Sequence, residues 1–201
     1  GQVDQGIYAV SIGQSTGRYG QNTNSVAIGT AAGSVIQGSY SIAMGYAAAN
    51  NWQGSNAVAI GFESGFEGQD NDSVAVGTSA GYMGQSNQSV AIGKWSGFSN
   101  QGALAVAIGN RAGQNFQGNN SVAIGGKAGS NDQNVYSIAI GSNAASTSQS
   151  FDCIAFGRNA GAIGQLGRAV AVGYNAGFQD QGSSAVAMGF YAGFQDQDTD
   201  S

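Results

Sequence analysis

A period of 16 residues runs through the chain without an insertion or deletion, and it limits the possible folds more than any other sequence feature. Chains with a fixed period of this size fold as stacked, equivalent units. We therefore expect twelve coils that form one repeat domain over residues 1–201. Each coil is marked by a glycine that follows an apolar residue: Gly13, Gly29, Gly45, Gly61, Gly77, Gly93, Gly109, Gly125, Gly141, Gly157, Gly173 and Gly189.

Two β-forming residues separated by a small residue stand immediately before each of these glycines, as in Val26-Ala27-Ile28 and Ile154-Ala155-Phe156. Short alternation of this kind, rich in Val and Ile and closed by Gly, predicts one β-strand per unit. A helix would need apolar residues at helical spacing over ten or more positions, and the glycines interrupt every unit before that length.

A second column of glycines lies four residues after the first. Recurrent glycine marks a backbone with positive φ or a close approach between chain segments, and here it predicts a turn. Two units have alanine at this position, which weakens the argument for positive φ. The column consists of Gly17, Gly33, Ala49, Gly65, Gly81, Gly97, Gly113, Gly129, Ala145, Gly161, Gly177 and Gly193.

Glutamine occurs eight residues after the strand-ending glycine in every unit. Stacked amide side chains can hydrogen-bond along the axis, so we expect a structural ladder that stabilises each coil without a ligand. The alternative is that these glutamines form a binding surface. The column consists of Gln21, Gln37, Gln53, Gln69, Gln85, Gln101, Gln117, Gln133, Gln149, Gln165, Gln181 and Gln197, with Gln5 in the same register upstream.

The fold class that follows is all-β, a parallel β-solenoid of about twelve 16-residue coils. Stacked at about 4.8 Å per coil, it would form a rod on the order of 58 Å long. We expect the Val and Ile columns to face a shared interior. The other face of the strand is restricted to Ala and Ser, with Cys153 as a small space-filling exception. This restriction indicates close packing against another wall of the coil or against a neighbouring chain. Because the core is small, we favour a homotrimer with the Ala/Ser face near the chain contacts.

Composition and motifs argue against several classes of protein. The net charge of −5 and six scattered basic residues provide no basic stripe for nucleic acid. A single cysteine and no histidine exclude a disulfide framework and Cys/His zinc spacings. The sequence contains no apolar run long enough to span a membrane. We therefore expect no cofactor, no metal site and no direct membrane insertion.

Individual residues offer weak candidates for chemistry. Hydrolysis would require a base that the chain lacks, and the calcium-loop pattern is absent. We therefore expect no catalytic residues and solvated loop carboxylates. Trp52 and the Lys94-Trp95 pair are expected to pack locally, although a host-binding patch would have to use such variable positions. The acidic residues that could serve in hydrolysis or calcium binding are Asp70, Asp72, Asp180, Asp196 and Asp198.

The units NSVAIGTAAG (24–33), QSVAIGKWSG (88–97), NSVAIGGKAG (120–129) and YSIAIGSNAA (136–145) resemble the SVAIG-x-x-A repeats in the heads of YadA-like trimeric autotransporter adhesins and related haemagglutinins. The resemblance implies a trimer of left-handed parallel β-rolls outside the bacterial outer membrane that binds host matrix proteins or other cells. It also implies that the aliphatic residues point inward: Val26, Ile28, Val90, Ile92, Val122 and Ile124. The uniform 16-residue length and the Gln column depart from the family's pattern.

Three functional classes remain from the sequence. The first is an extracellular, cell-surface or virion-surface rod that resembles an adhesin head and attaches to a surface or host component. The second is a self-assembling extracellular filament or a viral or phage fibre protein. The third is an ice-binding solenoid, which would be expected to carry a regular Thr array that this chain lacks.

Overall fold

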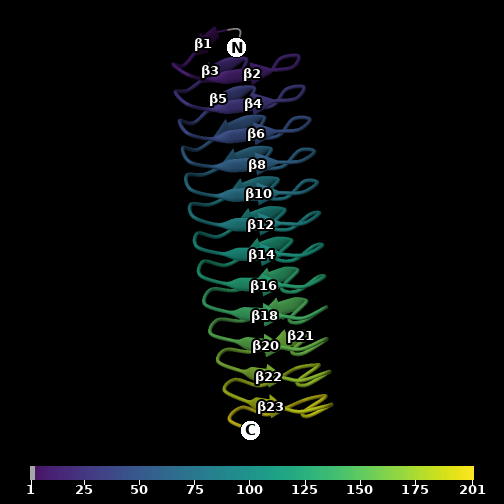
Figure 1. The fold of residues 1–201 in the computed structure, drawn as a ribbon. Helices are drawn as coiled ribbons and strands as arrows, with labels where there is room; N and C mark the ends of the chain where they lie inside the picture. The colour runs from purple at the N-terminus through teal and green to yellow at the C-terminus, as the bar shows by residue number, and fades with distance from the viewer. Residues whose placement is uncertain (1–2) are drawn as a thin grey trace.

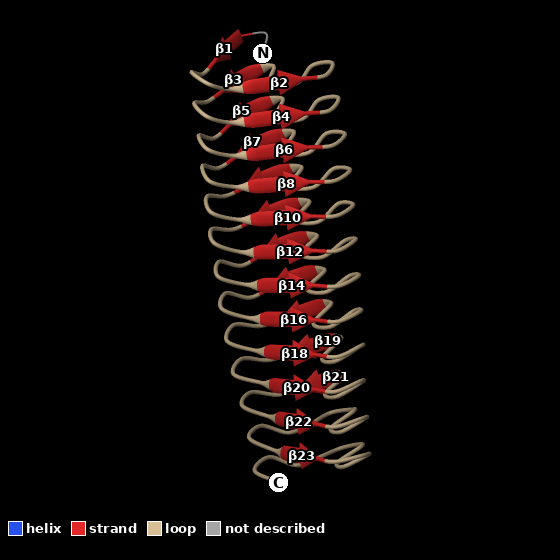
Figure 2. Cartoon of the chain, viewed as in Figure 1, coloured by secondary structure: helices blue, strands red, loops and turns tan. Residues whose placement is uncertain are grey.

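The computed structural model describes residues 3–201, and in it the chain winds into a regular stack of coils from one end to the other (Figure 1). The described residues contain strands and turns but no helix (Figure 2). Almost every coil places one strand in each of two parallel sheets; in the last coils, the glutamine side is paired only by isolated bridges at Gln179, Gln181 and Gln197. The all-β parallel solenoid expected from the repeat is therefore confirmed.

The first sheet, which we call the glutamine sheet, has eleven strands, and each of them ends on a glutamine of the repeated column. Its strands are β1 (Val3–Gln5), β3 (Tyr19–Gln21), β5 (Val35–Gln37), β7 (Asn51–Gln53), β9 (Glu67–Gln69), β11 (Met83–Gln85), β13 (Ser99–Gln101), β15 (Asn115–Gln117), β17 (Asn131–Gln133), β19 (Thr147–Gln149) and β21 (Ile163–Gln165).

The second sheet, which we call the aliphatic sheet, has twelve strands built from the Val/Ile-containing segments. Its strands are β2 (Val10–Ile12), β4 (Val26–Ile28), β6 (Ile42–Met44), β8 (Val58–Ile60), β10 (Val74–Val76), β12 (Val90–Ile92), β14 (Val106–Ile108), β16 (Val122–Ile124), β18 (Ile138–Ile140), β20 (Ile154–Phe156), β22 (Val170–Val172) and β23 (Val186–Met188).

The sequence predicted one strand per unit, and the structure has two in almost every coil. The strand that was missed, in the glutamine sheet, carries no apolar alternation, because its residues include Gly, Asn, Asp and Ser as well as Val and Ile. It is held by backbone pairing to the coils above and below, always with a 16-residue offset, as in Gln85 to Gln101. Stacking between coils therefore forms this strand without help from β propensity.

The turns continue the same pairing. The backbone amide of Gly45 donates to the carbonyl of Ile28 at 2.8 Å, and that of Ala47 to Thr30 at 2.9 Å. On the opposite side of the coil, the amide of Tyr40 donates to Thr23 at 3.0 Å. Since a backbone polar group without a partner is costly to bury, this bonding explains how narrow coils of 16 residues remain stable through their turns.

The interior of the coil reverses the expected orientation of the aliphatic strand. Ala27 and its equivalents are fully buried, while the flanking Val and Ile side chains face outward and are half-buried or exposed. The prediction that the Val and Ile columns face the interior, which the resemblance also implied, was therefore wrong for this chain. The physical reason is width: once the glutamine side chains of the opposite sheet are in place, the interior has space for the methyl and hydroxyl groups of Ala and Ser but not for Val and Ile.

The second glycine column adopts the turn conformation that its recurrence predicted. Gly113 has φ +49, and a Cβ there would lie 2.5 Å from Oε1 of Gln117. Both reasons for glycine, positive φ and close approach, therefore apply. The two alanine exceptions, Ala49 and Ala145, also have positive φ, at 47° and 44°.

Candidate functional site

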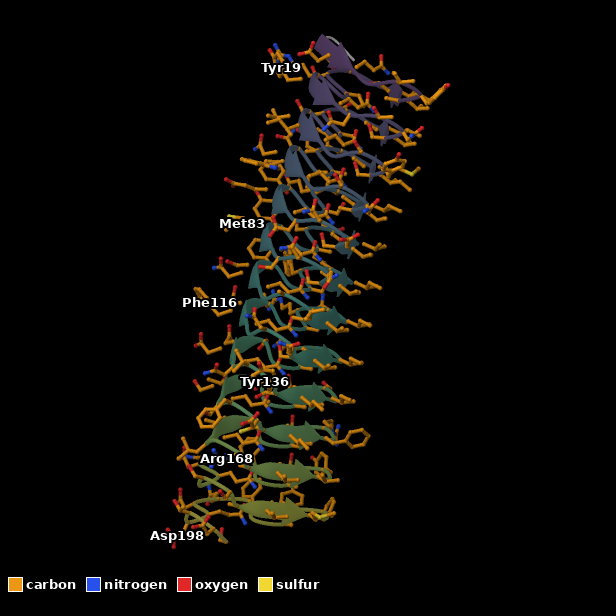
Figure 3. The ribbon with its side chains drawn as sticks, turned by 90° about the vertical axis from the view of Figure 1, so that its left-hand side faces the viewer. Tyr19, Met83, Phe116, Tyr136, Arg168 and Asp198 are labelled. Atoms are coloured by element: carbon orange, nitrogen blue, oxygen red, sulfur yellow. The ribbon has the colours of Figure 1, made fainter. Side chains whose placement is uncertain are left out.

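The most extensive functional feature is the outer face of the aliphatic sheet. Two apolar side chains per coil project from this face along the whole stack, and in Figure 3 they line the side opposite Tyr19, Met83 and Phe116. Their exposed fractions include 58% at Ile12, 36% at Ile108 and 66% at Met188. An unbroken apolar strip of this length is uncommon on a monomeric protein and marks an interaction surface.

The Ala/Ser face, which we expected to lie at chain contacts, lies inside the coil. Ser25, Ala57 and Cys153 are all fully buried by their own chain, as are the alanines in the middle of the aliphatic strands. The hydroxyl of Ser25 donates to the carbonyl of Asn22 at 2.6 Å, so the serines of this column hold the turn that precedes the strand. The restriction to small residues is therefore explained by the other wall of the same coil.

The repeated glutamines occupy the interior from the opposite sheet. Those from Gln21 to Gln181 are at most 2% exposed, and they are the largest fully buried side chains of the described residues. The Nε2 of Gln37 donates across the coil to the carbonyl of Val26 at 2.9 Å, and the Nε2 of Gln101 does the same to Val90 at 2.8 Å. Each glutamine thus ties the glutamine sheet to the backbone of the aliphatic sheet.

Hydrogen bonds between successive glutamines are present along part of the column. Five consecutive bonds of 3.0–3.3 Å link the side chains from Gln101 to Gln181, and a further one joins Gln53 to Gln69. The Oε1 atoms of Gln21, Gln37, Gln53, Gln85, Gln101 and Gln197 are buried and accept no hydrogen bond. The bond across the coil is therefore the more regular of the two interactions.

The carboxylates considered in the sequence do not converge. Asp70 and Asp72 lie exposed in the turn between β9 and β10, and Asp72 accepts a hydrogen bond from the Nδ2 of Asn56 at 3.1 Å. Asp180, Asp196 and Asp198 are exposed in the last coils. Within residues 3–201 no three His, Cys, Asp or Glu side chains come together as a metal site would require.

The aromatic candidates fall into two environments. Trp95 is half-buried and has two cations over its ring, with the Nζ of Lys94 4.2 Å and the Cζ of Arg111 4.7 Å from the ring centroid. Trp52, in the middle of β7, is 66% exposed. The expectation of local packing therefore describes Trp95 but does not describe Trp52.

Two titratable side chains have perturbed environments. Cys153 is fully buried, and burial raises the pKa of its thiol, which lies 2.9 Å from the carbonyl of Leu166. Burial also raises the pKa of Tyr82, and the charges of Glu63 and Glu67 add to that effect. Tyr82 stacks between Phe66 and Phe98, with ring centroids 4.9 Å apart on each side. Both environments are those of packed structural residues.

Sequence reasoning missed the aliphatic face as an interaction surface, although a signal for it was present. The middle residue of the strand is Ala in eleven units, whereas the flanking positions vary among Val, Ile, Met and Phe. Invariance of a small residue indicates a tightly enclosed position, and variation in size indicates a less confined one.

Comparison with known proteins agrees with these columns. Residues 117–144 match the family model described as the YadA head domain repeat, in two copies. No curated protein and no solved structure matches. No helix in the described chain is long and apolar enough to cross a membrane. The matched segment has the same strand, glycine and small-residue positions as the coils on either side of it. Residues 117–144 are therefore similar to YadA head domain repeats, and the coils on either side repeat the same residue pattern.

Proposed function

We propose that this chain forms the adhesive rod of an extracellular homotrimer that attaches its bearer to a surface or host component. The observation that carries the proposal is the outward aliphatic face, which extends from Val10 and Ile12 in β2 to Val186 and Met188 in β23. Three parallel rods that turn these faces toward a common axis would bury all of them in register. A closed threefold arrangement also leaves no further apolar face for open-ended growth.

The family supports the same assembly, because YadA-like heads are trimeric, are exposed on bacterial surfaces and bind host matrix components. The fold supports a role in binding over one in catalysis, since the repeat is a scaffold and its described carboxylates remain dispersed and exposed. Specificity would come from the outer face of the glutamine sheet and from the turns, where residue types differ from coil to coil.

Attachment is tested with the purified chain on fluorescent beads. Beads coated with the chain are added to wells that carry collagen, fibronectin, laminin, cultured epithelial cells or albumin, and bound beads are counted. We expect at least tenfold more beads on one matrix protein or on the cells than on albumin. Equal counts on all surfaces would contradict the adhesive role. Electron microscopy of the same sample should show rods of one length, and fibres that lengthen with concentration would instead support a filament.

A further inference from the structure

The outer face of the glutamine sheet contains a groove that runs along the rod. It lies between the middle residues of the strands and the first residues of the following turns. One hollow of about 320 Å³ is lined by residues that include Asn100, Phe116, Asp132, Gly118 and Asn134. Glycine is required at Gly118, because a Cβ there would lie 2.5 Å from the backbone nitrogen of Val135 in the next coil.

Two more hollows of about 280 Å³ each continue the groove toward the last coils. The middle one shares Asp132 and Asn134 with the first hollow, and it shares Gly164 and Leu166 with the third. From Asn100 to Asp180 the groove covers five coil steps, or about 24 Å at 4.8 Å per coil. The shape is therefore suited to an elongated ligand that lies parallel to the axis. We call this feature the axial groove.

Phe116 contributes an exposed aromatic ring to the axial groove. Its side chain is 59% exposed, and its backbone has φ +54, a region that disfavours large side chains. Gly68, Gly84 and Gly164 stand at the equivalent position of other coils. Figure 3 shows Phe116 directed away from the stack. What distinguishes Phe116 from Trp52 and Ile36, which share its column and its positive φ, is its place in the lining of the axial groove.

The chemistry of the lining defines the ligand further. Asp132, Asp180 and Asp198 contribute carboxylates, and the remaining polar lining is mainly of amides and hydroxyl groups, while no Lys or Arg lines any of the three hollows. Such a lining offers hydrogen bonds to hydroxyl groups and repels polyanions. A ring such as that of Phe116 offers an apolar surface to the C–H face of a sugar.

The repeat distance favours a glycan over a peptide. Equivalent lining positions recur every coil, about 4.8 Å apart, whereas an extended peptide advances about 3.3 Å per residue. The ring-to-ring advance of an extended β-1,4-linked glycan is close to the coil spacing. We propose that the axial groove binds a linear, uncharged polysaccharide along the rod, with Phe116 stacked against one sugar ring. The inference rests on the proposed function, since it names the kind of surface component that the rod would hold.

The groove remains open in the proposed trimer. Its lining belongs to the glutamine sheet and the turns that follow it, and the proposed contact between chains belongs to the opposite sheet. Each rod of a trimer would therefore carry one axial groove on its outer side.

The test is isothermal titration calorimetry of the purified chain with cellohexaose, chitohexaose, a heparin hexasaccharide and decalysine. We expect one of the two uncharged oligosaccharides to bind and the heparin fragment not to bind. Phe116→Gly should weaken that binding at least tenfold without lowering the thermal unfolding midpoint, because glycine relieves the backbone strain. The matched control is Trp52→Gly. Trp52 has the same column position, φ +60 and high exposure, but it lies outside the axial groove, so its loss should leave affinity unchanged.

Three results would overturn the inference: no binding of either uncharged oligosaccharide, equal affinity of wild type and Phe116→Gly, or binding of decalysine alone. Light scattering and the bead assay on the same preparation separate this failure from failure of the proposed function. A trimer that attaches to cells but binds no oligosaccharide contradicts the axial groove alone. A chain that neither trimerises nor attaches contradicts the proposed function, whatever the calorimetry shows.

Discussion

The glutamine side chain is the one long group inside each coil, and its length matches the gap between the two sheets. Its Nε2 reaches the carbonyl of the first residue in the aliphatic strand, as between Gln101 and Val90, and also approaches the carbonyl of Ala105 at 3.3 Å. A shorter side chain would leave these carbonyls without this donor, and a charged one would be costly to bury. We propose that the column fixes the sheet separation in every coil.

Gln101→Ala tests this role. The substitution removes the donor to Val90 and to Gln117 and leaves a cavity, so we expect the free energy of unfolding to fall by about 2–4 kcal/mol. Urea titration followed by circular dichroism measures the free energy of unfolding of each variant. Asn87→Ala is the control, because Asn87 is exposed and Ala103 stands at the same position one coil later. Equal stability of the two variants would argue against a structural glutamine column.

Two glycine substitutions distinguish a turn position that has no room for a Cβ from one that has room for a side chain. Gly109 has φ +129, and a Cβ there would lie 2.7 Å from the carbonyl oxygen of Gly125. Gly109→Ala should therefore cost about 3 kcal/mol or more. Gly68 has φ +68 with its nearest neighbour 3.9 Å from the Cβ position, and Asn100 occupies the same column. Gly68→Asn should change stability by less than about 1 kcal/mol. Thermal unfolding midpoints that fall equally in both variants would contradict this distinction.

At the scale of the strand, alternation determined which residues share a face but not which face is inside. The Val-Ala-Ile segments were recognised from the sequence, together with their parallel stacking and 16-residue register. Hydrophobicity then assigned Val and Ile to the interior, where the structure places Ala107 and its equivalents. A slip of one residue exchanges the two faces, so the error reversed the whole sheet.

The features that could not be predicted depend on contacts between coils. The glutamine strands form because backbone groups pair across a 16-residue offset, and no local pattern in Asn115–Gln117 or Asn131–Gln133 indicates a strand. The axial groove likewise arises from side chains that are 16 and 32 residues apart. The position of Phe116 against Asp132 becomes visible only once the coils are stacked.

Enlarging two adjacent residues of β14 tests the orientation of the aliphatic sheet. Ala107 is fully buried, so Ala107→Leu should overpack the coil and cost about 1–3 kcal/mol or more. Ile108 faces outward, and Phe156 occupies the same position three coils later. Ile108→Phe should therefore fold with nearly wild-type stability. Differential scanning calorimetry compares the two variants, and greater damage from Ile108→Phe would mean that the faces are reversed.

At the scale of the whole molecule, the outward aliphatic face explains why a rod with an interior of alanine, serine and glutamine would need partners. Fully burying one Val or Ile side chain contributes about 1.5–3 kcal/mol relative to leaving it exposed, and two such side chains per coil remain partly exposed on the isolated chain. Association through this face would bury the larger apolar groups that the narrow coil excludes. The interior then sets the geometry of the rod, and the contact between chains supplies much of its hydrophobic stabilisation.

The mass of the purified chain in solution, measured by size-exclusion chromatography with light scattering, tests this account most directly. We predict about 60 kDa for wild type, three times the chain mass of 20.0 kDa. Ile92→Lys combined with Ile108→Lys should give monomers of 20.0 kDa that are less stable to heat than the wild-type trimer, because two charges per chain would lie in the contact. Met83→Lys, at an exposed position of the glutamine sheet, should remain trimeric. A wild-type monomer, or a double-lysine variant that remains trimeric, would contradict the account.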